Sequence, residues 1–371
     1  VSLRIELTPQ VKTLSVVEIQ GQKEISRTES QVSIKKITAQ DIEKMPSIGG
    51  QADIAQYIQV LPGVVFSGDQ GGQLYIRGGS AIQNKVLLDG MVIYNPFHSI
   101  GLFSVFETDV IRNADIYTGG FNAKYGGRLS SIMDITTKDG NKKTTSGKIS
   151  ASTFGASAIL EGPILKDNDQ RDYSLSYLIT EKNSYLSQTS KSLYSYVDNK
   201  LPYDFFDLYG KLTLASSSGS KINLFGFNFT DNVDGYKDIA NFDWKNRGIG
   251  ANFIIIPNNS PALVEGVFAY SDYTMTMKQT SDNTTQKSNI GSFNGNLAVT
   301  RFFRKNQLKY GLELIGNTTN TEYESDEEIK DYSTDAGAYM IFKGFLGNLL
   351  YEPSIRFSYY ASLDEFIPEP R

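Results

Sequence analysis

The chain has 371 residues, of which 40% are hydrophobic and 21% charged, and no stretch approaches the roughly 20 apolar residues of a membrane-spanning helix. It contains no cysteine and one histidine, which excludes disulfide scaffolds and thiol catalysis and weakens most metal sites. Its net charge of −5 argues against a nucleic-acid partner, since nucleic-acid binders gain affinity by neutralising phosphates.

Residues 1–137 read as a compact mixed α/β unit. An apolar strand at 1–7 ends before Pro9. One helix is predicted at 38–45, where Thr38 can cap the N-terminus and Asp41 follows three residues later, and a second at 52–60, before Pro62. Short strands bounded by turn residues are then expected at 74–76, 86–88, 92–93, 114–117 and 132–135.

After residue 143 the pattern changes to long strands with alternating polarity. Between 172 and 180, Tyr173, Leu175, Tyr177 and Ile179 alternate with polar residues, and Leu178 is the one exception; segments 308–314 and 354–359 alternate in the same way. About eleven strands are expected between 145 and 363. Tight turns alternate with longer polar loops along the chain, which is the pattern of an outer-membrane β-barrel. A soluble β-sandwich is the alternative, but its strands are usually shorter.

Four segments carry a family resemblance by their order and spacing: Tyr57–Val64, Leu74–Gly78, Asn84–Gly90 and Ala123–Arg128, the last leading into 132–138. Together they resemble the plug domain of TonB-dependent receptors of the Gram-negative outer membrane. Segments 95–98 and 119–126 look like the version found in Bacteroidetes. Segment 1–8 looks like the last strand of the small carboxypeptidase-regulatory-like domain that often precedes such plugs.

The resemblance implies a small α/β plug domain inside an antiparallel transmembrane β-barrel in the cell outer membrane, with 22 strands in a complete receptor and about eleven in this chain. The expected domains are the end of the regulatory-like domain at 1–10, a linker at 11–29, the plug at 30–140 and the first half of the barrel at 141–371. Such a receptor imports a scarce ligand, such as a metal chelate, a cobalamin or a glycan, with energy delivered by TonB. An incomplete receptor is therefore expected.

The resemblance also assigns roles to residues of the plug. Val16, Val17, Glu18 and Ile19 occupy the place of the Ton box, which can add a strand to the sheet of TonB; an ordinary linker strand is the alternative. Arg77 matches an arginine that holds the plug by pairing with barrel carboxylates, and its partners are expected beyond Arg371. The family's second arginine is replaced here by Thr118, and Arg128 is a candidate substitute.

Structural turns are expected at Gly78, at Asp89 and Gly90, and at Gly126 and Gly127, where glycine permits positive φ or close packing. Candidates for facing the ligand lie on a plug loop and on a long loop of the barrel: Tyr94, Asn95, Phe97, His98, Tyr194 and Tyr196. A packed histidine and plain loop residues are the alternatives.

Other classes of protein leave weaker signals. No nucleophile elbow or pair of carboxylates placed for acid–base work is recognisable, so no catalytic residue, cofactor or metal ligand is assigned. A receptor-shaped structural subunit of an outer-membrane secretion or assembly complex is the stronger alternative. Besides TonB and outer-membrane lipid, a surface lipoprotein is a candidate partner, and the ligand depends on loops that vary freely within the fold.

Overall fold

The computed structural model describes residues 33–47, 51–67, 73–98, 101, 103–166, 172–193, 201–236, 239–258, 260–323 and 328–371. The predictions for residues 1–32, including the Ton box, and those for Tyr194 and Tyr196 lie outside these ranges. No helix within these ranges has the length and apolar character needed to cross a membrane.

The N-terminal domain is built on a mixed five-stranded sheet with the order β1-β6-β7-β4-β5, in which β4 and β7 run parallel. A separate hairpin pairs β2 with β3. The elements are β1 Ile34–Ile37, α2 Ala39–Glu43, α3 Ile54–Gln59, β2 Val64–Ser67, β3 Gln73–Ile76, β4 Asn84–Leu88, β5 Met91–Ile93, β6 Ile111–Tyr117 and β7 Ser131–Thr137, with 3-10 turns at Ala81–Gln83 and Thr108–Val110.

Both predicted helices of this domain are confirmed. Thr38 caps α2 in a capping box with Asp41, which satisfies free N–H groups at both positions. Helix α3 starts two residues later than predicted because the Asp53 carboxylate caps it, accepting from Ala55 N at 2.8 Å. Its apolar side buries Ile54 and Ile58 against the sheet.

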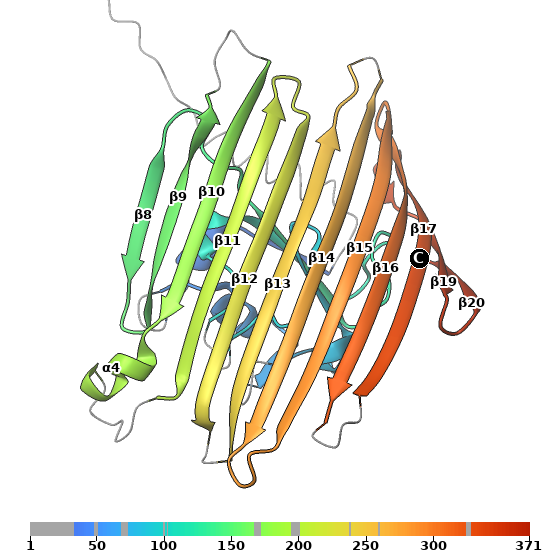
Figure 1. Ribbon diagram of the computed structural model, residues 1–371. Helices are drawn as coiled ribbons and strands as arrows, with labels where there is room; N and C mark the ends of the chain where they lie inside the picture. The colour runs from blue at the N-terminus through green and yellow to red at the C-terminus, as the bar shows by residue number, and fades with distance from the viewer. Residues whose placement is uncertain are drawn as a thin grey trace, which may run out of the picture.

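The rest of the chain is an antiparallel sheet of 13 strands in which neighbours in sequence pair in order, so a two-layer sandwich is excluded. Figure 1 shows β8 to β17 side by side, with the N-terminal domain behind them. The strands are β8 Ser146–Ala151, β9 Gly155–Leu165, β10 Tyr173–Ser184, β11 Tyr203–Ser216, β12 Lys221–Tyr236, β13 Ala240–Ile255, β14 Ala262–Gln279, β15 Thr285–Phe303, β16 Asn306–Glu322, β17 Glu328–Leu346, β18 Leu349–Tyr351, β19 Ser354–Tyr360 and β20 Glu365–Pro370; helix α4, Leu186–Leu193, follows β10.

All eleven predicted long strands overlap observed strands. The last of them is interrupted at Glu352 and Pro353, because proline cannot donate to a ladder, so β18 and β19 pair with separate parts of β17. A further strand, β20, follows β19 and pairs with it. Helix α4 lies at one end of the sheet, which we call the long-loop end, and the two-residue turns from β15 to β16 and from β17 to β18 lie at the other, the short-turn end (Figure 1).

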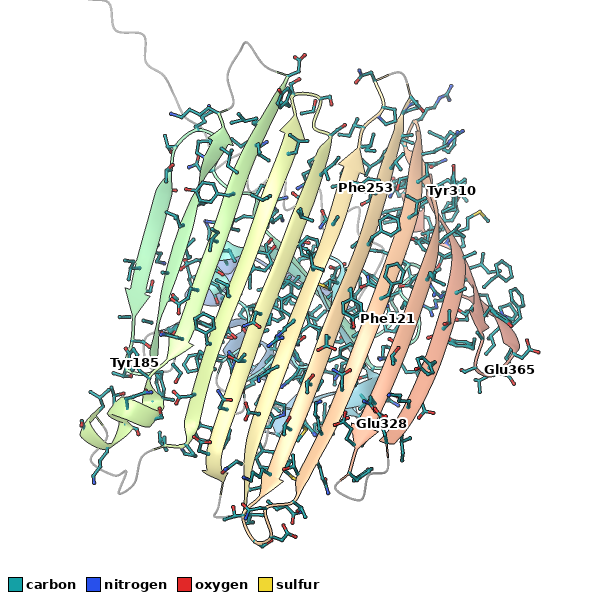
Figure 2. The ribbon with its side chains drawn as sticks, in the orientation of Figure 1. Phe121, Tyr185, Phe253, Tyr310, Glu328 and Glu365 are labelled. Atoms are coloured by element: carbon teal, nitrogen blue, oxygen red, sulfur yellow. The ribbon has the colours of Figure 1, made fainter. Side chains whose placement is uncertain are left out.

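The two faces of this sheet differ, and we call its inward face, together with the strands that carry it, the wall. Large apolar side chains point outward and stay exposed, including Leu212, Leu224, Phe268 and Leu312 (Figure 2 gives the side chains along the strands). Inward positions are mostly polar or small. The predicted exception in β10, Leu178, points inward and is fully buried in the core of the N-terminal domain.

Candidate functional site

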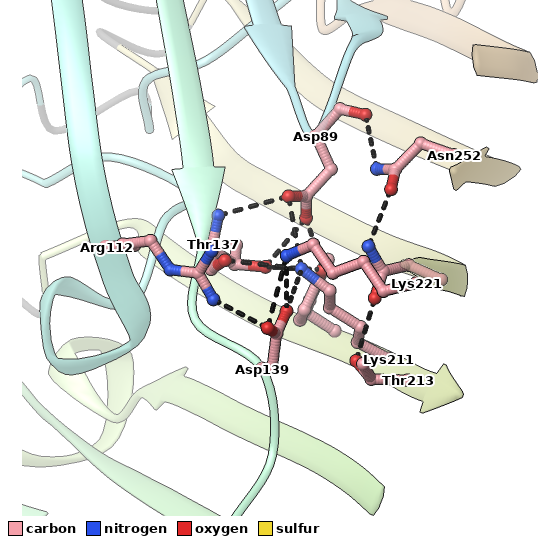
Figure 3. A network of polar contacts seen from close by, with 10 residues as sticks. Asp89, Arg112, Thr137, Asp139, Lys211, Thr213, Lys221 and Asn252 are labelled. Carbon is pink, nitrogen blue, oxygen red and sulfur yellow. Dashed lines mark hydrogen bonds and ion pairs between the residues drawn. The ribbon is translucent and has the colours of Figure 1, made fainter. Parts of the chain in front are cut away.

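The tight turn between β4 and β5 places a carboxylate inside the interface between the N-terminal domain and the wall. Asp89 and Gly90 have φ values of 51° and 90°, the left-handed conformation that a two-residue hairpin turn requires. The Asp89 carboxylate accepts hydrogen bonds from the hydroxyls of Tyr209 at 2.6 Å and Thr137 at 2.7 Å, and lies 3.3 Å from Lys211 Nζ (Figure 3). Asp89 and Lys211, whose side chains are both buried, therefore neutralise each other.

A second carboxylate extends this network toward the short-turn end of the wall. Asp139 lies 2.8 Å from Arg112 Nη2, 3.1 Å from Lys221 Nζ and 3.7 Å from Lys211 Nζ (Figure 3). Burial acts to raise the pKa of Asp139, but the hydrogen bond and charge of Arg112 and the nearby lysines outweigh it, so the pKa is lowered. The ionised carboxylate thus joins the N-terminal domain to β11 and β12.

A second ionic contact crosses the interface at β16 and β19. Lys85 of β4 lies 3.1 Å from Glu313 Oε1, and Arg356 Nη2 lies 2.7 Å from Glu313 Oε2. Arg356 also donates from Nε to Ser358 Oγ at 2.9 Å. All three charged groups are nearly buried, so removing Glu313 would leave two cations without their shared counter-charge in the interface.

The single histidine is packed against the wall at the long-loop end. His98 Nε2 lies 2.8 Å from Asp207 Oδ2 and Nδ1 lies 3.6 Å from Asp231 Oδ2, while the ring stacks on Phe205 at 3.9 Å. Burial acts to lower the pKa of His98, but the charges and hydrogen bonds of the two aspartates outweigh it and raise the pKa to about 9. At neutral pH the imidazolium is therefore a cationic link between the N-terminal domain and the wall.

A lysine of β10 also joins the wall to the N-terminal domain. Lys182 Nζ donates to the carbonyl of Ser104 at 2.6 Å and lies 3.4 Å from Asp53 Oδ2. Asp53 also caps α3 and accepts from Ser104 N at 2.9 Å. One wall side chain therefore fixes the start of α3 relative to the segment that follows His98.

The model of the TonB-dependent receptor plug domain matches residues 26–131. This part of the chain is thus similar to a TonB-dependent receptor plug domain. No curated protein matches the sequence closely enough to count as a relative.

The whole fold is similar to solved outer-membrane receptors. The siderophore receptor PirA from Acinetobacter baumannii matches with a TM-score of 0.67 and 16% identity, over 93% of this chain and 59% of that one. A variant of the ferric enterobactin receptor PfeA from Pseudomonas aeruginosa gives 0.69 and 12%, over 93% and 59%. The outer membrane transporter YddB from Escherichia coli gives 0.65 and 12%, over 91% and 58%. The chain thus has the fold of a receptor plug with part of its barrel, and spans less than two thirds of these structures.

The two arginines expected to hold the plug make local contacts within the described residues. Arg77 has a φ of 50° and lies with Nη1 3.5 Å from Ser33 Oγ. Arg128 donates to the carbonyl of its neighbour Gly127 at 2.7 Å. Their pairing with barrel carboxylates therefore stays a prediction.

The expected structural glycines fall into two kinds. Gly78 and Gly127 have positive φ, 79° and 74°, which L side chains rarely adopt. Gly126 has ordinary backbone geometry, but a Cβ there would collide with the guanidinium of Arg356. Its role is therefore to let a wall arginine approach the plug backbone.

The candidates for facing a ligand lie against the wall where they are described. Phe97 and His98 are 2% and 1% exposed, so contact with a ligand would require their loop to leave the wall. Tyr94 donates from its hydroxyl to Asn317 Oδ1 at 3.0 Å, and the carbonyl of Asn95 lies 3.5 Å from Asn246 Nδ2.

The charged residues that join the plug to the wall were missed by the sequence analysis. They are Asp53, Lys85, Lys182, Lys211, Glu313 and Arg356. Their signal was present, since those of the barrel occupy inward positions of alternating strands, where a charge needs a partner from the plug. Their pairing joins positions too distant in sequence for a pattern to reveal.

Proposed function

We propose that the protein is an outer-membrane TonB-dependent transporter that imports a scarce ligand, and that this chain supplies its plug and the first part of its barrel. The observation that carries the proposal is the plug packed against the inward face of a wall whose outward face is apolar. The proposed division is the end of a regulatory-like domain at 1–10, a linker at 11–29, the plug at 30–140 and the barrel at 141–371.

The outward face supports a lipid environment. Leu212, Leu224, Phe268 and Leu312 are 40% to 62% exposed and lie on four different strands, whereas water-soluble surfaces rarely carry a contiguous apolar band. On β14 the outward positions change from Phe268 and Tyr270 to Asp272 and Thr274, so the band ends before the strand does. We place the longer loops outside the cell and the short turns on the periplasmic side.

The contacts between plug and wall support movement during transport. Buried ion pairs contribute little net stability compared with apolar packing, yet they define one docked position. Pulling by TonB on the linker would separate such contacts, and water would replace them. In this proposal the protein is a transporter and not a catalyst.

The ligand class is proposed from the compared structures. The names of PirA and PfeA refer to a siderophore and to ferric enterobactin, which favours a metal chelate over a cobalamin or a glycan. Tyr94 and Asn95 remain proposed contacts to the ligand, with Tyr194 and Tyr196 on a barrel loop. A surface lipoprotein is a further proposed partner.

The proposed TonB contact can be tested at the linker. In the full-length protein, Val17→Pro should abolish binding of the periplasmic domain of TonB, because proline removes an N–H needed to add a strand. Val11→Pro, outside the proposed Ton box, is the matched control. Unchanged TonB binding by the Val17 variant would contradict the assignment.

Uptake provides the second measurement. Ferric enterobactin and other ferric chelates are supplied to cells that carry the wild type or the Val17→Pro variant, and cell-associated iron is measured. Energy-dependent uptake that the variant lacks supports transport. A structural subunit would instead co-purify stoichiometrically with a secretion or assembly complex and leave iron uptake unchanged.

A further inference from the structure

The plug contacts the wall in two different ways. Toward β9, β10 and β12, its apolar core continues without a break into the wall through Ile159, Leu178, Phe225 and Phe227. Separating such surfaces exposes apolar area to water, at a cost of about 25 cal/mol per Å². This side of the interface therefore resists opening.

Toward β13, β14 and β15, the plug presents the edge of its sheet, and among the described residues the apolar core includes only Ala269 from these strands, with Val267 packed against it. Strand β5 is the last strand of the sheet order, and wall side chains lie along it. Asn252 donates from Nδ2 to the carbonyl of Asp89 at 3.0 Å, and Asn294 does the same to Gly90 at 2.9 Å. These are side-chain hydrogen bonds and not a strand ladder, so water can replace them one by one, at about 1 kcal/mol each.

Three buried polar atoms of the wall without a hydrogen bond lie on these strands, namely Asn246 Oδ1, Ser271 Oγ and Asn294 Oδ1. Among the described residues, others lie on β10, β11 and β16, so what distinguishes these three is their position on the strands that contact β5. Gly248 pairs with Ser271 across β13 and β14 and has no side chain, so Met91 of β5 fills its place. Buried oxygens of this kind cost free energy unless water or another polar group reaches them.

A cavity of about 210 Å³ lies at the short-turn end of this strip, large enough for several water molecules. It is bounded by the Asp89 and Gly90 turn, by β11 to β15 and by the start of β16. Five cationic side chains and three carboxylates line it, namely Arg112, Lys124, Lys211, Lys221 and Lys309 with Asp89, Asp134 and Glu265. Figure 3 shows part of this lining, where Asp89 faces Lys211 and Lys221.

We propose that the ligand passes between β5 and wall strands β13 to β15, and that the β4–β5 hairpin is the part of the plug that moves aside. The proposal rests on the transport function proposed above. The unpartnered strip and the charged cavity then form one polar track toward the periplasmic end. Such a lining suits a polar, hydrated ligand that exchanges hydrogen bonds along its way, and disfavours an apolar one.

Four buried serines allow a matched test by cysteine accessibility. Ser271 of β14 and Ser292 of β15 lie on the proposed track, whereas Ser174 and Ser176 lie outside it on β10; all four are 3% exposed or less. Because Ser176 Oγ also lacks a hydrogen bond, this control tests the position of the serine and not its missing partner. Each is changed singly to cysteine in a full-length protein without other cysteines, which preserves size and folding. Cells are labelled with a membrane-impermeant fluorescent maleimide, with and without a protonophore.

The expected result is labelling of Ser271→Cys and Ser292→Cys that is several-fold faster in energised cells and falls when TonB is deleted. Ser174→Cys and Ser176→Cys should stay unlabelled under both conditions. Binding of the TonB periplasmic domain is measured on the same variants.

The other outcomes separate the two proposals. Energy-dependent labelling at Ser174 or Ser176 but not at Ser271 or Ser292 would overturn the track and leave transport standing. Labelling that never responds to energy, in a protein that binds TonB, would also overturn the track. Loss of the proposed function would instead appear as no TonB binding by any variant, the wild type included.

Discussion

The guanidinium of Arg356 occupies the space in which a side chain at Gly126 would stand. Gly337 of β17 leaves room for the same group from the wall side. Arg356 thus reaches through two glycines, one from the plug and one from the barrel, to bind Glu313 at 2.7 Å. The relationship ties a glycine of the plug motif to an ionic contact far along the chain.

Gly126→Ala should therefore weaken plug docking by about 2 kcal/mol, since the methyl group displaces Arg356 and leaves Glu313 with Lys85 alone. Because Gly126 has no positive φ, backbone strain does not contribute. The measurement is urea unfolding of the plug in the detergent-solubilised full-length protein. In an Arg356→Ala background, Gly126→Ala should destabilise the docked plug by less than about 0.5 kcal/mol. Equal destabilisation in both backgrounds would contradict the predicted collision between the new methyl group and Arg356.

Two plug aspartates offer a comparison between a buried and an exposed ion pair. Asp89 pairs with buried Lys211, and Asp109 lies 2.7 Å from Lys148, which is 56% exposed. Asp89→Asn should destabilise the docked plug by about 2–3 kcal/mol, because Lys211 loses its nearer counter-charge and keeps only Asp139 at 3.7 Å. Asp109→Asn should cost below about 1 kcal/mol, since water screens that pair.

Leak current through the full-length protein in a planar lipid bilayer checks this difference. The Asp89→Asn variant should conduct ions at a urea concentration at which the wild type and the Asp109→Asn variant do not. If the two variants leak alike, the buried network of Figure 3 does not hold the plug.

The local patterns of the sequence predicted most of the fold, because strand alternation and helix caps depend on near neighbours. Thr38 with Asp41, and the outward Tyr173, Leu175 and Tyr177, are of this kind. The candidate site depends instead on pairs such as Lys85 with Glu313, which lie 228 positions apart. The alternation of β16 places that glutamate on the inward face but does not indicate which cation it meets, so the charge could be predicted and its partner could not.

The buried histidine gives a pH dependence whose sign follows from its raised pKa. Since the pKa of His98 is about 9 when docked and 6.5 is its ordinary value, the stabilisation is complete below pH 6.5 and is lost as the pH rises through 9. This shift corresponds to about 3 kcal/mol. The groups that face the ring are Asp207, Asp231 and Phe205, with Lys182 over the same Phe205 ring.

Hydrogen–deuterium exchange of the peptide containing His98 reports this local stability. The ratio of its exchange rate in His98→Gln to that in the wild type should be largest near pH 6.5 and approach a constant above pH 9, because comparison at equal pH cancels the intrinsic rate. A ratio that does not vary across this range would contradict the charged link to Asp207.

Leu178 gives the sharpest test of continuity between the plug core and the wall. It breaks the alternation of β10, points inward and is fully buried among plug side chains. Leu178→Ala should destabilise the docked plug by about 2–5 kcal/mol, the cost of a cavity in a packed core. Leu212→Ala on neighbouring β11 removes the same atoms from the outward face, where the side chain is 40% exposed, and should leave the plug unaffected.

Amide exchange of α3, whose Ile54 and Ile58 belong to the same core, measures both variants. Faster exchange in the Leu178 variant alone is expected, because only that side chain fills space inside the plug. Equal exchange in the two variants would mean that the wall does not contribute to the plug core.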